Sequence, residues 1–82
     1  MELGIFKPLG SRTAVAEIWE SERLLAEVFA REDGVRRLYL SEEAVASGLD
    51  WRRFSGLVPE IEAALDKADE EMREARERLG EL

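Results

Sequence analysis

The chain has 82 residues and a formal net charge of −7, from 12 basic and 19 acidic side chains. This length makes one small domain spanning residues 1–82, and 45% hydrophobic residues can form a core, which excludes wholesale disorder. The chain contains no His, Cys, Asn or Gln. Imidazole and thiol chemistry, disulfides and ordinary zinc sites are therefore excluded.

Neither membrane insertion nor secretion is expected. Every uncharged run is far shorter than the ~20 residues that span a bilayer. The start, Met1 to Leu3, lacks the basic region of a signal peptide. A cytoplasmic protein is the expectation. The missing thermolabile residues are typical of proteins from organisms that live at high temperature, although the excess of Arg over Lys fits a GC-rich genome equally well.

The first segment, residues 1–12, is predicted to be an N-terminal extension or an edge strand. Its apolar residues Ile5, Phe6 and Leu9 lie between two glycines. They are enough for one short strand over residues 4–7, which would widen the sheet predicted from the next segment.

Residues 13–40 predict a three-stranded antiparallel meander. Segments 13–20, 24–31 and 35–40 are rich in β-branched and aromatic residues and are separated by short polar turns. The pair Asp33 and Gly34 predicts a two-residue type I′ turn, because both central residues of that turn need positive φ.

This turn sets a register that places Phe29 opposite Leu38. Side chains alternate between the faces of a strand, so the register assigns the residues of the core face. They are Val15, Trp19, Leu25, Phe29, Leu38 and Leu40.

The other face of the predicted sheet is too apolar to stay in water. It would carry Ala14, Ala16, Ile18, Leu24, Ala26, Val28 and Tyr39. Antiparallel sheets with one wet face alternate more sharply between apolar and polar residues. We therefore expect residues 1–12 or a second subunit to cover this face, with Ile18, Val28 and Tyr39 as candidate interface residues.

A short helical turn over residues 42–47 is predicted after the meander. Ser41 precedes two glutamates and can cap its N-terminus, and Gly48 can close it. Asp50 can then cap the helix that follows.

A long amphipathic helix is predicted over residues 50–79, kinked or broken near residues 55–59, where Pro59 lies. From Trp51 to Leu82 an apolar residue recurs every three or four positions. A helix from Pro59 onward is ~32 Å long, whereas a six-residue strand spans ~20 Å, so the helix should overshoot the sheet. The end of the seam adds candidate interface residues for a second copy: Met72, Ala75, Leu79 and Leu82.

No pattern predicts catalysis, a cofactor or a metal site. None of the serines lies in a nucleophile motif. The acidic cluster of Asp66, Asp69 and Glu70 lacks the calcium-loop pattern. We expect Asp69 to pair with Arg73, one turn further along a solvated helix face.

The acidity is concentrated at the end of the chain, where residues 60–82 hold nine acids and four bases. This surface suits a basic protein partner, with Glu70, Glu74 and Glu77 as candidate contacts. A nucleic-acid-associated regulator is the alternative. It would use Arg36, Arg37, Arg52 and Arg53 across a dimer, and a steep dependence of affinity on salt would reveal it.

The sequence therefore predicts an α+β domain with a three-stranded meander, or a four-stranded one with residues 4–7, and a long C-terminal amphipathic helix. The expected function is a homodimeric, non-enzymatic protein-interaction module with an antitoxin-, immunity- or inhibitor-like role.

Overall fold

The computed structural model describes residues 1–80 and has an α+β fold. Four antiparallel strands form one sheet in the order β1-β2-β3-β4, and two helices follow them. The prediction of a β-meander followed by a long helix is confirmed, and the N-terminal segment supplies the fourth strand. The elements are β1 (Glu2–Phe6), β2 (Val15–Glu20), β3 (Arg23–Ala30), β4 (Arg36–Leu40), α1 (Glu42–Ser47) and α2 (Trp51–Gly80).

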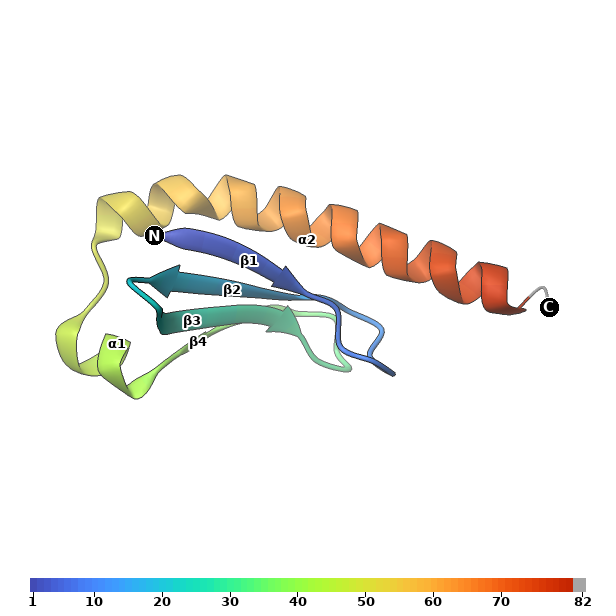
Figure 1. Cartoon of the computed structure of the whole chain (residues 1–82), viewed down its shortest axis with the longest axis horizontal. Coiled ribbons are helices and arrows are strands. Elements are labelled where there is room, and N and C mark those ends of the chain that lie inside the picture. The colour runs from blue at the N-terminus through green and yellow to red at the C-terminus, as the bar shows by residue number, and fades with distance from the viewer. Residues whose placement is uncertain (81–82) are drawn as a thin grey trace.

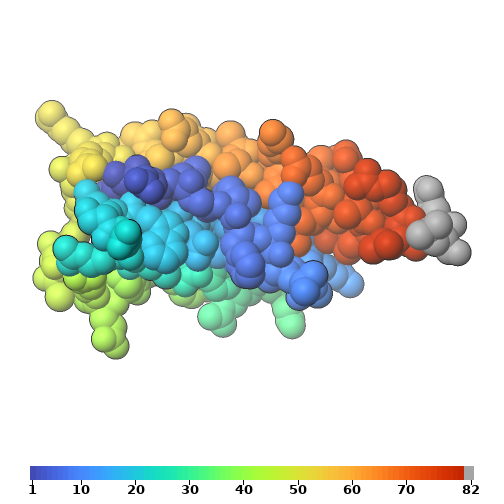
Figure 2. Space-filling model, viewed as in Figure 1, coloured from blue at the N-terminus to red at the C-terminus, as the bar shows by residue number. Residues whose placement is uncertain are grey.

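Helix α2 lies across one face of the sheet and continues past the ends of the strands (Figure 1). Thirty helical residues span ~45 Å, and the longest extent of the molecule is 49 Å. In the space-filling view the C-terminal end of α2 projects beyond the body of the protein (Figure 2). The helix therefore overshoots the sheet, as its length predicts.

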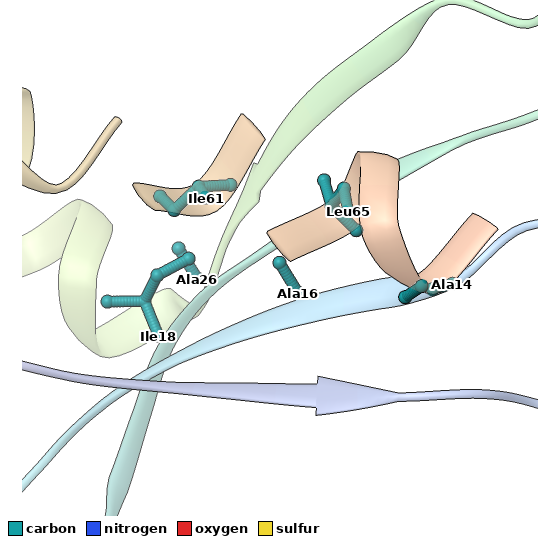
Figure 3. Packing of buried hydrophobic residues seen from close by; sticks show 7 residues of the cluster. Ala14, Ala16, Ile18, Ala26, Ile61 and Leu65 are labelled. Atoms are coloured by element: carbon teal, nitrogen blue, oxygen red, sulfur yellow. The ribbon is translucent and has the colours of Figure 1, made fainter. Parts of the chain in front are cut away.

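The core lies between α2 and the two central strands (Figure 3). Ile61 and Leu65 of α2 meet Ile18 and three alanines of the sheet side. Small alanine side chains let the helix backbone approach the sheet closely, while Ile18 and Leu65 supply the bulk. The buried cluster consists of Ala14, Ala16, Ile18, Ala26, Ile61, Leu65 and Ala68.

The predicted core face is wrong: its members divide between the two sides of the sheet, and the β3–β4 loop is longer than the predicted two-residue turn. Ala30 pairs with Arg36, which leaves residues 31–35 in the loop, and Phe29 pairs with Arg37 instead of Leu38. A shift of one residue moves every side chain of a strand to the opposite face. The faces of β3 and β4 were therefore combined wrongly: Leu38 and Leu40 lie on the α2 side, whereas Val15, Trp19 and Phe29 lie on the far side. Leu25 packs against the buried cluster beside a register shift that follows Ile18.

Helix α2 covers much of the face that residues 1–12 or a second subunit were expected to cover. Ala14, Ala16, Ile18 and Ala26 are its buried members. Its other predicted members divide between the two sides. Val28 lies on the α2 side, opposite Leu38, whereas Leu24 and Tyr39 lie on the far side, opposite Trp19 and Glu27.

The caps of both helices follow the sequence prediction. The Ser41 hydroxyl accepts the N–H of Ala44 at 3.1 Å, and Gly48 closes α1 with φ of 76°. The Asp50 carboxylate accepts the N–H of Arg53 at 3.0 Å.

A kink or a break was predicted near residues 55–59, and the break is not present, because helix α2 is continuous through Pro59. Proline removes one backbone hydrogen bond from a helix interior. The buried residues Ile61 and Leu65 hold the next turns of the helix against the sheet.

The two-residue hairpin turn of the sheet joins β2 to β3. Ser21 and Glu22 have φ of 50° and 65°, and Glu20 pairs with Arg23 on either side of them. Two successive positive φ values are typical of a type I′ turn. Ser21 and Glu22, neither of which is a glycine, therefore adopt the turn conformation that was predicted for Asp33 and Gly34.

Candidate interaction surfaces

Part of the α2 side of the sheet is left uncovered. Helix α2 packs over β1 and β2, and the short α1 packs against β3 and β4. A helix with its side chains is ~10 Å across, whereas four strands at ~4.8 Å spacing present a wider surface. One long helix therefore cannot cover the whole sheet, and a groove remains between β4 and α2.

This β4–α2 groove is almost entirely apolar. Leu38 and Leu40 on its floor are 42% and 44% exposed, and Val45 and Trp51 at its α1 end are 68% and 75% exposed. Clustered exposed apolar residues mark interaction sites, and tryptophan is enriched in protein interfaces. The groove is lined by Val28, Leu38, Leu40, Val45, Leu49, Trp51, Phe54 and Val58, with Arg36, Arg37 and Glu62 at its other end.

The far face of the sheet, which we call the open face, carries aromatic and charged side chains. Phe29 and Tyr39 stack with their ring centroids 4.5 Å apart. The guanidinium of Arg31 lies 5.3 Å from the Tyr39 ring centroid, and its Nε donates to the Tyr39 hydroxyl at 2.9 Å. Glu17 and Glu27 face each other directly across β2 and β3 on this face. Like charges in this position are unfavourable to bury, so the open face suits water better than the groove does.

A bridge of charged groups ties the sheet to the middle of α2. The Arg36 guanidinium lies 2.8 Å from the Asp66 carboxylate and 3.2 Å from that of Asp69. The other oxygen of Asp69 accepts the N–H of Ala14 at 2.7 Å. Partial burial disfavours the charged form of Arg36, but its hydrogen bonds to Asp66 and Asp69 outweigh this and raise its pKa.

The expected pairing of Asp69 with Arg73 is therefore wrong. Asp69 is half-buried and turned towards the sheet, and Arg73 pairs instead with Glu70 and Glu77. The sequence places Asp69 beside the seam residue Ala68, and that position is the signal that could have indicated a role at the sheet.

A second ion pair closes the β3–β4 loop. Arg37 donates to both carboxylate oxygens of Asp33, at 2.6 and 3.1 Å, and the N–H of Val35 donates at 3.0 Å. The hydrogen bond from Arg37, followed by that from Val35, lowers the pKa of Asp33 from 3.8 to about 2.

Replacing Arg37 by methionine is expected to raise the pKa of Asp33 from about 2 towards 3.8. Because the folded-state value is depressed, the stabilisation from this pair is present above pH 3.8 and is lost as the pH falls through about 2. Carbon-detected NMR titration of the Asp33 carboxyl measures the change. Arg53→Met, at a distant site, is the control. An unchanged Asp33 pKa in Arg37→Met would contradict the assignment.

The four arginines of the nucleic-acid alternative do not form one cluster. Arg36 and Arg37 pair with acids at the start of β4, and Arg53 pairs with Glu20 at 2.9 Å. Sixteen residues of α2 separate Arg53 from Asp69, the partner of Arg36, which corresponds to ~24 Å along the helix. Three of the four charges are thus already matched by carboxylates, and no observation favours nucleic acid as the ligand.

The predicted interface residues do not lie on one surface, and one of them is in the core. Ile18 is fully buried under α2, Val28 lines the groove, and Tyr39 lies on the open face. Met72 and Ala75 are half-buried and Leu79 is exposed near the end of α2. The last predicted interface residue, Leu82, lies outside the described residues.

The three predicted partner-binding acids form one exposed stripe on α2. Glu70 and Glu77 flank Arg73 and both pair with it. These hydrogen bonds, that of Glu70 first, raise the pKa of Arg73. Glu74 makes no ion pair with another residue of the described chain. The stripe therefore remains accessible and net negative.

Within residues 1–80, no group of three or more acidic side chains is arranged to hold a metal ion. None of the helices in this range is long and apolar enough to cross a membrane. Comparison of the chain with protein-family models, curated proteins and solved structures found no match.

Proposed function

We propose that this chain is a small, non-enzymatic protein-interaction module of the cytoplasm, which works as a homodimer and binds a basic partner protein through α2. The observation that carries the proposal is the β4–α2 groove. Four of its side chains, among them Trp51, are more than 40% exposed in a single chain. Burying such a surface against another protein removes apolar area from water at ~25 cal/mol per Å².

The proposed contact with a basic partner rests on the stripe of Glu70, Glu74 and Glu77. These side chains are exposed on the C-terminal half of α2, and the end of that helix continues past the strands (Figure 1). A projecting helix with a negative face can reach into a basic cleft of another protein, where charge complementarity favours fast association. An inhibitor, antitoxin or immunity protein would use such a surface.

The experiment compares two variants with equal changes of charge. Reversing Glu70, Glu74 and Glu77 to lysine should remove partner binding while sparing the fold. Reversing Glu2, Glu22 and Glu32, which are also exposed but lie outside α2, changes the net charge equally. Immobilised wild-type and variant proteins are incubated with lysate of the source cell, and each protein that the wild type retains is purified and titrated against all three.

We expect a basic partner that binds the variant with Glu70, Glu74 and Glu77 reversed at least tenfold more weakly than the wild type. Its affinity for the variant with Glu2, Glu22 and Glu32 reversed should fall less. Its wild-type affinity should also weaken with added salt, because exposed charges are screened. A partner that binds the α2 reversal as tightly as the wild type would contradict the role of the stripe.

A further inference from the structure

We propose that strand β4 pairs antiparallel with β4 of a second copy, with the twofold axis at Leu38. This inference rests on the homodimer of the proposed function and specifies its interface. The occupant of the free edge of β4, and of the apolar surface beside it, is therefore a second copy of the same chain.

The backbone groups of alternate β4 residues point away from β3, towards the free edge of the sheet. The strand lies at the edge of the sheet, with β3 on one side only. The N–H of Ser41, which follows β4, donates to the carbonyl of Leu25 on β3 at 2.9 Å. Backbone groups of successive strand residues point alternately to the two sides. Arg37 and Tyr39 therefore bond towards β3, and Arg36, Leu38 and Leu40 present their N–H and C=O groups at the free edge.

The outward-facing backbone groups of β4 are complementary to those of an identical strand that runs antiparallel to it. With the axis at Leu38, that residue lies opposite its own copy, and Arg36 lies opposite Leu40 of the second copy. Each of these is a hydrogen-bonded pair of an antiparallel ladder, because both members present their groups outward. The pairing satisfies the free edge along the whole of β4, which would otherwise be a site of uncontrolled association.

The side chains of β4 also fit this register. On the groove side, Leu38 meets Leu38 of the second copy, which covers a side chain that is 42% exposed in the single chain. On the open face, Arg37 lies opposite Tyr39 of the second copy. No two like-charged residues of the two strands are directly opposite each other in this register.

The other exposed surfaces fit a second copy less well. A dimer through the open face would bury the opposed acids Glu17 and Glu27. The other free edge, β1, is packed under α2 and is followed by Lys7, which pairs with Glu71 of that helix. The edge of β4 instead continues directly into the exposed apolar groove.

A cysteine at the axis tests the interface in an otherwise cysteine-free chain. Opposed residues of a hydrogen-bonded antiparallel pair have Cα atoms ~5.5 Å apart, within the range that a disulfide can bridge. Leu38→Cys should therefore form a covalent dimer under mild oxidation. Val35→Cys is the control. Val35 is exposed to a similar degree in the preceding loop, but the register separates its two copies by ~20 Å.

A charge swap provides a second test that needs no covalent bond. Leu38→Asp and Leu38→Lys should each be monomeric, because the axis places like charges directly opposite each other. An equimolar mixture should form a heterodimer, because the axis then pairs Asp with Lys. Circular dichroism checks that each variant is folded, and sedimentation measures its mass.

Cross-linking of Leu38→Cys well above that of Val35→Cys, with rescue in the mixture of charged variants, is the expected result. A wild-type dimer in which Leu38→Cys cross-links no more than Val35→Cys would overturn this interface and leave the proposed homodimer standing. A wild-type protein that is monomeric at tens of micromolar would overturn both.

Discussion

Replacing Leu65 by alanine is expected to lower the free energy of unfolding by about 2–5 kcal/mol, the usual cost of deleting most of a buried leucine. Leu65 is 1% exposed and fills the space above the alanines of the sheet (Figure 3). A domain of this size has only ~3–5 kcal/mol of stability from its core. The variant should therefore be largely unfolded, and urea titration followed by tryptophan fluorescence measures the loss.

The control for this prediction is the same substitution at Leu9, which is fully exposed. Leu9→Ala should change the free energy of unfolding by less than ~0.5 kcal/mol, as is usual at surface positions. Equal midpoints for the two variants would mean that α2 does not cover the sheet as described.

Replacing Asp69 by alanine is expected to lower the free energy of unfolding by about 1–3 kcal/mol, because it leaves a buried backbone donor without an acceptor. Asp69 accepts the N–H of Ala14, a residue that is fully buried, and it also pairs with Arg36. Asp69→Asn keeps an acceptor oxygen for the Ala14 N–H and should recover most of the loss. Urea denaturation at neutral pH measures both variants.

The matched control is Asp66→Ala. Asp66 also pairs with Arg36, at 2.8 Å, but its side chain is 71% exposed. Exposed ion pairs contribute ~0–1 kcal/mol. If Asp66→Ala lowered the free energy of unfolding as much as Asp69→Ala, the ion pair with Arg36, rather than the hydrogen bond from Ala14, would be the main stabilising contact of Asp69.

The elements of the fold could be predicted from the sequence because each has a local signal. Ser41, Gly48 and Asp50 mark the ends of the helices, and the spacing of apolar residues from Phe54 to Ala75 matches the alternation of buried and exposed positions along α2. The pairing of the strands could not be predicted in the same way. It depends on the length of the loop over residues 31–35, and Asp33 and Gly34 fit a two-residue turn as well as they fit this longer loop.

This one-residue difference moved only Leu38 and Leu40 to the opposite face relative to the other strands. The assignment of Phe29 and Trp19 to the core was a separate error, because the helix packs on the face that carries Ala14, Ala16 and Ala26. Close packing of a helix favours small residues on the opposing sheet, and these alanines allow it. Bulk on the buried side comes from only a few residues, chiefly Ile18 of the sheet with Ile61 and Leu65 of α2.

The candidate site could be predicted only in part. The acidic stripe of Glu70, Glu74 and Glu77 follows from helical spacing and is exposed as expected. The β4–α2 groove was missed, because Leu38 and Leu40 were assigned to a closed core. The available signal was the width of the sheet. A single long helix covers about two strands, and a fourth strand was already predicted in the N-terminal segment. The position of Arg36 against Asp66 and Asp69 depends on tertiary packing and has no local signal.

Sedimentation equilibrium of the wild-type protein determines whether the apolar surface left open beside β4 is closed by association with a second copy. At tens of micromolar we expect a mass twice the 9.3 kDa of one chain, with dissociation on dilution. A mass of one chain that stays constant as the concentration rises would contradict it.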